Sequence, residues 1–203
     1  MLLLVTGCGA KAPDYQSIWA SSTTATTTGR PVPISDYLEQ HKVTGAPMTR
    51  QTLTELTVSI PQPPGWTVVS DPNQPTAFEI LRKTAVQAYQ PTATLMVFKL
   101  MGDFNVSEAI QHGYADAELS EKFVRLDASM NSFHGMPSSM IEGSYTVKDQ
   151  RLHTYNRIVI PTGPPPNNQR YLVQFSVTTA ADQAQAQSAD VETIIKGFTV
   201  TPK

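Results

Sequence analysis

The sequence predicts an α+β domain in which an antiparallel sheet of about six strands is covered by helices, an α/β/α sandwich. Three observations lead to this fold class. Segments with the two-residue period of strands are interspersed with segments of helical period. From residue 139 onward, short polar or proline-rich segments separate the strands, as they do between antiparallel neighbours. The segment 92–100 is apolar on both faces, which indicates layers above and below the sheet.

The first elements expected are a short helix and three strands. A capping pattern predicts a helix from Ser35 to His41, with its first residue at the N-cap and Leu38 facing inward. Leu56 to Ile60 alternates between apolar and polar residues, as a half-buried strand does, and the segment PQPPG ends it. Further strands are expected from Trp66 to Val69 and from Ala77 to Arg82. The tryptophan that begins the first of these belongs in the core.

The middle of the domain combines a long strand with a helix. Thr92 to Leu100 predicts the strand, and Asn105 to Leu119 predicts the helix, with its asparagine as N-cap. One apolar stripe runs along this helix, formed by Val106, Ile110, Tyr114 and Ala117. Met96 and Phe98 of the strand could line a pocket for a lipid tail together with Ile110 and Tyr114, or all four could simply fill the core.

The last part of the domain predicts three strands and a closing helix. The strands are expected at Ser139 to Val147, Arg151 to Ile160 and Arg170 to Thr179. The helix is expected from Ala181 to Lys196 and should end at a C′ glycine, Gly197. Its inward residues are expected to be Val191, Ile194 and Ile195, with Phe198 and Val200 packing after it.

The amino-terminal segment predicts a lipid anchor. Cys8 is the only cysteine, so no internal disulfide can form. It follows Val5-Thr6-Gly7, which matches the bacterial lipobox, so the thiol is expected to accept a diacylglyceryl group after cleavage before Cys8. Residues 1–7 would then be the remnant of a truncated signal peptide, because they hold no Lys or Arg and only a short apolar run. The alternative is an unmodified start on a cytoplasmic protein.

Residues 8–33 are expected to form a tether between the anchor and the domain. The stretch SSTTATTT has no apolar periodicity, and such a segment cannot bury enough surface to offset its ordering entropy. A plain linker is the preferred interpretation, and O-glycosylation is the alternative. Residues 34–203 form the single globular domain in this interpretation.

Composition and motifs argue against several classes of function. The formal net charge is −2, which gives no basic surplus for nucleic acid. The four histidines fall in different expected elements without metal-ligand spacing, so no metal site is predicted. Gly143-Ser144-Tyr145 lies inside a strand and lacks the second glycine of a nucleophile elbow. No catalytic residue and no cofactor are therefore assigned.

Several segments together carry a resemblance to a known family. The lipobox, the Ser/Thr-rich tether, "ISDYLEQHKV", "VSIPQPPGW" and "IIKGFTVTP" resemble the LpqN/LpqT-type lipoproteins of mycobacteria. That family is similar in fold to the Mog1/PsbP class. The resemblance implies an envelope lipoprotein without known enzymatic activity, in a family with a member that assists trehalose-mycolate lipid trafficking and contacts membrane transporters. Only Cys8 is transferred as a functional residue.

The expected function is that of a non-enzymatic lipoprotein on the outer face of the cytoplasmic membrane. It would bind an amphipathic glycolipid of the acyl-trehalose type and present it to an envelope transporter or assembly partner. One alternative is a protein-protein adaptor for envelope transporters that has no lipid ligand. Another is an enzyme whose site carries no recognisable motif. Sequence alone assigns no ligand-binding residue.

Overall fold

The computed structural model describes residues 30–84 and 89–203. Their strands are β1 Thr44–Pro47, β2 Leu56–Ser59, β3 Trp66–Val68, β4 Glu79–Lys83, β5 Thr92–Met101, β6 Val124–Ser129, β7 Ser138–Val147, β8 Gln150–Val159, β9 Tyr171–Ala180 and β10 Thr199–Pro202. The α-helices are α2 Ile34–Gln40, α3 Val106–Ala109, α4 Ala115–Glu118 and α5 Ser188–Lys196, and the 3₁₀ helices are η1 Ile110–Tyr114 and η2 Ala181–Gln183. None of the helices within these ranges is both long and apolar enough to cross a membrane.

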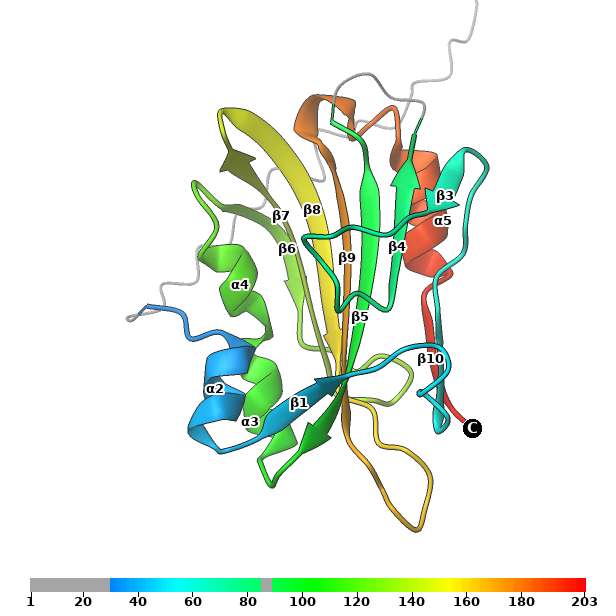
Figure 1. The fold of residues 1–203 in the computed structure, drawn as a ribbon. Helices are drawn as coiled ribbons and strands as arrows, with labels where there is room; N and C mark the ends of the chain where they lie inside the picture. Colours follow the sequence, from blue (N-terminus) through cyan, green and yellow to red (C-terminus); the bar gives the residue numbers. More distant parts are fainter. Residues whose placement is uncertain (1–29, 85–88) are drawn as a thin grey trace, which may run out of the picture.

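The strands form one large antiparallel sheet and one small one. The large sheet has the order β3-β4-β5-β9-β8-β7-β6, and β1 also pairs with β5. In Figure 1, α2, α3 and α4 lie on one side of this sheet, and α5 lies on the other with β10. We call these sides the front face and the back face. The α+β sandwich is confirmed, but about six strands was too few: the described residues form an eight-stranded sheet and a two-stranded pair of β2 and β10.

Separate cores hold the two layers against the sheet. On the back face, the largest fully buried side chains include Trp66, Phe175 and Phe198, and the rings of the last two stack with centroids 4.6 Å apart. On the front face, α2 and η1 pack Ile34, Leu38 and Ile110 against the sheet. The expected core positions of Trp66 and Leu38 are confirmed.

The expected helix 105–119 is present as a helical run over residues 106–118, but its middle is a 3₁₀ segment. Asn105 is the N-cap, because its Oδ1 accepts hydrogen bonds from the backbone N–H groups of Ser107 and Glu108. Beyond Ala109, however, the chain continues as η1 and α4. Gly113 lies in η1 against Ser139 of β7, so close that a Cβ there would meet Ser139 Oγ at 1.9 Å. The short helices cover only one end of the front face (Figure 1).

The ends of two other helices also differ from expectation. The helix α2 begins at Ile34 with Pro33 at the N-cap, and Ser35 Oγ donates instead to Asp36 Oδ1. Residues 181–183 form η2, and α5 begins only at Ser188. Gly197 ends α5 with φ −91°, so it is not a left-handed C′ glycine. A glycine fits there because a Cβ would lie 2.5 Å from Pro61 Cγ.

Candidate functional site

A cavity of about 590 Å³ lies on the back face beside α5, over β7 and β8. We call it the α5 pocket. Side chains from the sheet and from α5 face one another across it, so residues distant in sequence share one site. Its lining consists of Leu126, Glu142, Ser144, His153, Tyr155, Thr179, Ala181, Ala184, Gln185, Ser188, Val191, Glu192 and Ile195.

The sheet side of the α5 pocket carries hydrogen-bonding groups. His153 Nε2 lies 2.9 Å from Glu142 Oε1 across the β7–β8 pairing. Ser144 Oγ accepts a hydrogen bond from Arg151 Nη2 at 2.6 Å. Thr179 is 1% exposed, and its Oγ1 has no hydrogen-bond partner among the described residues. A buried hydroxyl without a partner costs free energy unless a ligand supplies one.

The helix side of the α5 pocket mixes apolar side chains with the polar side chains of Gln185, Ser188 and Glu192. Val191 and Ile195 are half-buried on α5 and pack against the back core, and Leu126 of β6 lines the same space. Burial raises the pKa of Tyr155, while Arg157, whose Nε donates to Tyr155 Oη at 2.8 Å, acts in the opposite direction. The pocket therefore combines an apolar cluster of Val191, Ile195 and Leu126 with polar groups from both the sheet and the helix.

Thr179→Val should stabilise the fold, because valine has nearly the same shape and removes the unpaired hydroxyl. We expect the free energy of unfolding to rise by about 1 kcal/mol. For a chain of this size that raises the melting temperature by roughly 2–4 °C. Thermal and urea unfolding of the two proteins measure this difference. A variant less stable than the parent would show that Thr179 Oγ1 already has a favourable partner.

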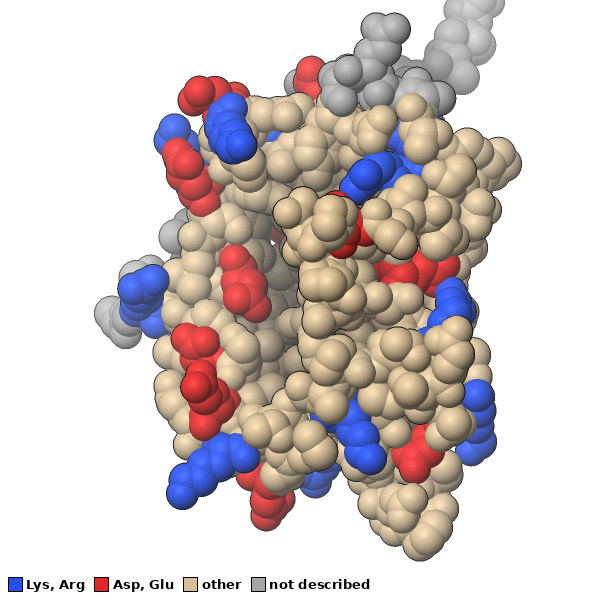
Figure 2. Space-filling model, viewed as in Figure 1, with Lys and Arg blue, Asp and Glu red and all other residues tan. Residues whose placement is uncertain are grey.

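A second hollow, the polar cleft, lies on the front face. Two adjoining parts of about 430 Å³ and 640 Å³ share Gln74, Tyr89, Thr92 and Thr94 in their linings. Figure 2 shows the hollow between the α4 side of the molecule and the segment 70–78. Its floor comes from the front-facing residues of β5, β8 and β9.

The structure separates the four residues proposed as a lipid-tail lining. Met96 lies in the floor of the polar cleft. Phe98 and Ile110 pack in the front core, and the Tyr114 ring lies under the Arg125 guanidinium at 5.5 Å. The interpretation as core filler holds for Phe98 and Ile110.

The four histidines do not gather at one site, and only His41 and His112 lie near each other. His41 and His112 flank the Tyr37 ring, with ring centroids 4.2 Å and 4.7 Å from it. His134 is an exposed loop residue beside Phe133, and His153 belongs to the α5 pocket. In the part of the chain that the structure describes, no three His, Cys, Asp or Glu side chains gather as metal ligands would.

Comparisons with known proteins agree with this fold. A family model described as "Probable lipoprotein LpqN" matches residues 30–201. The Mycobacterium tuberculosis protein named "Putative lipoprotein LpqT" is 52% identical over 200 residues, covering 97% of this chain and 87% of that protein. Its Mycobacterium leprae counterpart is 50% identical over 198 residues, covering 97% of this chain and 89% of that protein.

A solved structure supports the same relationship at the level of fold. The crystal structure of LpqN, described as involved in cell envelope biogenesis of Mycobacterium tuberculosis, superposes with a TM-score of 0.73. The two chains are 18% identical, and the superposition covers 86% of this chain and 100% of that one. The resemblance to LpqN/LpqT-type proteins is confirmed: the chain belongs to the LpqN family of mycobacterial lipoproteins.

Proposed function

We propose that this protein is a non-enzymatic envelope lipoprotein that binds an acyl-trehalose glycolipid and assists its transport or assembly with an envelope transporter. Cys8 would carry the lipid anchor and hold the domain at the outer face of the cytoplasmic membrane. The lipobox before Cys8 supports the anchor, as does membership of a lipoprotein family. Cys8 itself lies outside the described residues. Each buried methylene of an anchor contributes about 0.8 kcal/mol, so two acyl chains hold far more firmly than one.

The observation that supports a glycolipid ligand is the mixed apolar and polar lining of the α5 pocket. An acyl chain would lie along Val191, Ile195 and Leu126, which removes apolar surface from water. The sugar hydroxyls would meet Thr179 Oγ1 and the Glu142–His153 pair on the sheet. The volume of about 590 Å³ falls within the roughly 300–1,000 Å³ typical of small-molecule pockets.

Binding without turnover is supported by how the polar groups of this pocket are engaged. A serine nucleophile needs a base within hydrogen-bond reach. Ser144 Oγ instead accepts from the Arg151 guanidinium, which can take no proton from it. His153 Nε2 is directed to Glu142. The relatives compared above are named as lipoproteins and not as enzymes.

Filling the α5 pocket should abolish lipid binding. Val191→Trp places an indole in the space that the acyl chain would occupy, so we expect the 1:1 adduct with trehalose 6-palmitate to disappear. The measurement is native mass spectrometry of the full chain carrying Cys8→Ser, purified without detergent and then incubated with this lipid.

Thr193→Trp is the matched control, because Thr193 is an exposed residue of the same helix and does not line the pocket. This control should retain the adduct. An adduct of equal intensity on Val191→Trp would place lipid binding elsewhere. A parent protein that stays free of lipid, under conditions that load a known lipid carrier, would favour the adaptor function and direct the search to protein partners.

A further inference from the structure

The polar cleft lies on the opposite face of the sheet from the α5 pocket. Thr154 and Thr178 face the cleft, whereas the adjacent His153 and Thr179 face the other way, as strand alternation requires. One small ligand cannot reach both places, because the sheet and its back core lie between them. Whatever occupies the cleft is therefore independent of the glycolipid proposed for the α5 pocket.

Hydroxyl and amide groups form the floor of the cleft. Thr94 and Thr154 are 8% and 4% exposed, although they lie on a face that is only partly covered. Thr154 Oγ1 lies 3.3 Å from Thr178 Oγ1 and accepts a hydrogen bond from Asn156 Nδ2 at 3.2 Å. Cross-strand pairing places Ser176 beside Thr94 on one side and beside Asn156 on the other. Hydroxyls and amides both donate and accept, which is the chemistry that recognises a polyhydroxylated ligand.

Two tyrosines add aromatic surface to this floor. Tyr145 and Tyr89 line the cleft together with Thr178 and Thr92. Burial raises the pKa of both phenols, so both stay neutral at physiological pH. Each offers an apolar ring and a hydroxyl to the cleft, and these suit the C–H face and the hydroxyl edge of a sugar ring.

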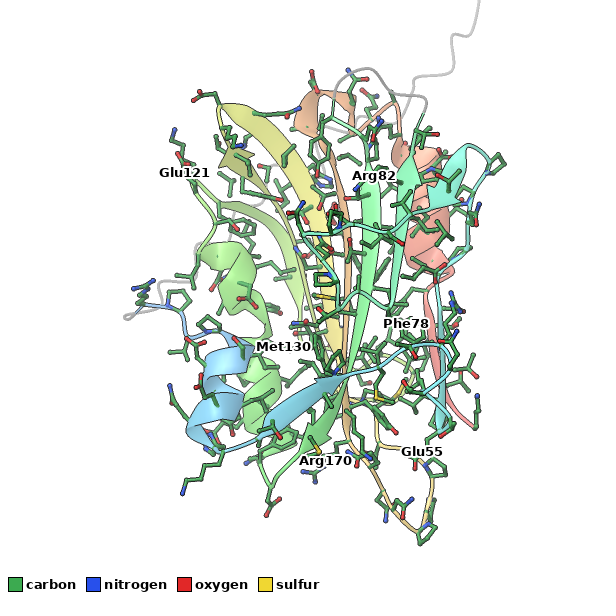
Figure 3. All side chains as sticks on the ribbon, in the orientation of Figure 1. Glu55, Phe78, Arg82, Glu121, Met130 and Arg170 are labelled. Carbon is green, nitrogen blue, oxygen red and sulfur yellow. The ribbon has the colours of Figure 1, made fainter. Side chains whose placement is uncertain are left out.

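The two arginines that line the cleft already have hydrogen-bond partners. Arg82, labelled on β4 in Figure 3, is paired with Asp71 at 3.0 Å. Arg157 donates to Tyr155 Oη and Ser138 Oγ on the back side of β8. Asp116 adds a carboxylate, which would repel a phosphate or a carboxylate. Both arginines in the lining are thus already engaged, and anion recognition depends on such groups being available.

From these contacts we propose that the polar cleft binds a short neutral saccharide. The sugar could belong to a free glycan or to the headgroup of a glycolipid, since both present the same hydroxyls. The site is separate from the α5 pocket, so saccharide binding in the cleft can be tested independently of lipid binding in that pocket.

The test is a titration of the ¹⁵N-labelled full chain carrying Cys8→Ser, followed by amide chemical shifts. Trehalose, maltose, glucose 6-phosphate and trehalose 6-palmitate are the probes. We expect saturable shifts at Thr94, Thr154 and Ser176 with at least one disaccharide, and none with glucose 6-phosphate. Shifts there with trehalose 6-palmitate but with neither disaccharide would identify a glycolipid headgroup as the source.

A threonine of β9 supplies the test variant, and a threonine of β10 supplies its control. Thr178→Val removes a cleft hydroxyl and should weaken saccharide binding about fivefold, as the loss of one hydrogen bond of about 1 kcal/mol predicts. Thr201→Val makes the same change at an exposed position of β10 that lines neither site, and it should leave the affinity unchanged. Ser176→Ala is a smaller change in the same floor and replaces Thr178→Val if that variant unfolds.

Two results would overturn the proposal: no saturable shift in the cleft with any neutral sugar, or tighter binding of glucose 6-phosphate than of the disaccharides. If a disaccharide gives saturable shifts at the cleft residues but the protein forms no lipid adduct, the glycolipid function is refuted and the saccharide site is supported. If Val191→Trp abolishes the adduct with trehalose 6-palmitate and the cleft residues show no shift with any sugar, the glycolipid function is supported and the saccharide site is refuted.

Discussion

Trp66→Ala should lower the free energy of unfolding by about 3–5 kcal/mol, the range for truncating a large buried aromatic side chain. Trp66 is 1% exposed and lies in the back core between the sheet and α5. Its Nε1 donates to Asp190 Oδ2 at 3.1 Å, and the same oxygen accepts from Lys83 Nζ at 2.6 Å. The substitution therefore leaves a cavity and also removes a hydrogen bond that ties α5 to the sheet. Urea unfolding followed by circular dichroism measures the loss.

Trp66→Phe separates the two contributions, because it keeps most of the apolar bulk and loses only the hydrogen bond to Asp190. Its loss of stability should be clearly smaller, and equal losses for both variants would show that packing contributes little.

The hydrogen bond from Lys83 holds the pKa of Asp190 below its usual value, and Trp66 acts in the same direction. The stabilisation that ionised Asp190 provides is fully present above its unfolded-state pKa, and it is lost as the pH falls through its lower folded-state pKa. The stability difference between the parent and Asp190→Asn should shrink over that acidic range.

Gly113→Ala should cost about 3 kcal/mol, at the upper end of the usual range for overpacking. A Cβ at position 113 would lie 1.9 Å from Ser139 Oγ and 2.9 Å from Ser139 Cβ. Ser139 is 1% exposed on a central strand, so it has little room to move away. The main-chain separation between η1 and β7 would have to increase. Thermal unfolding measures the loss.

Gly45→Ala is the control for this prediction, because a Cβ there meets Phe98 Cβ at an ordinary 3.5 Å. It should change stability little. Adding Ser139→Gly to Gly113→Ala should restore part of the loss, since it removes both clashing atoms, and a double-mutant cycle gives the coupling energy. A Gly113→Ala variant with the same melting temperature as the parent would show that η1 can move away from β7 at little cost.

The strands that could be predicted are those whose pairing repeats regularly. The hairpin of β7 and β8 shows this, since an unbroken register runs from Val147 and Gln150 to the far end of both strands. The missed strands lack that regularity. In β6 the register shifts between Arg125 and Asp127, so the two-residue period is interrupted. The four-residue strand β1 contains a glycine and a proline, and its neighbour β5 provides its pairing.

The candidate sites were harder to predict than the fold, for a physical reason. Polar residues alternating along a strand, such as Thr154 and Asn156, have the pattern of a solvated face. That pattern becomes a cleft only because the segment 70–78 and α4, distant in sequence, form its sides (Figures 1 and 2). The close approach of Gly113 to Ser139 of β7 is likewise a contact that no local sequence signal reports.

The alternation along β9 has a consequence for how this family can diversify. Residues 174, 176 and 178 face the polar cleft, while 175 and 177 fill the back core and 179 borders the α5 pocket. Substitutions at the even positions can therefore change the polar cleft, while the odd positions preserve the back core and the α5 pocket, without any change of the backbone. A one-residue insertion within the strand would exchange the two sets at once. Relatives should accordingly differ in β9 by replacement and tolerate length changes only in the loops that flank it.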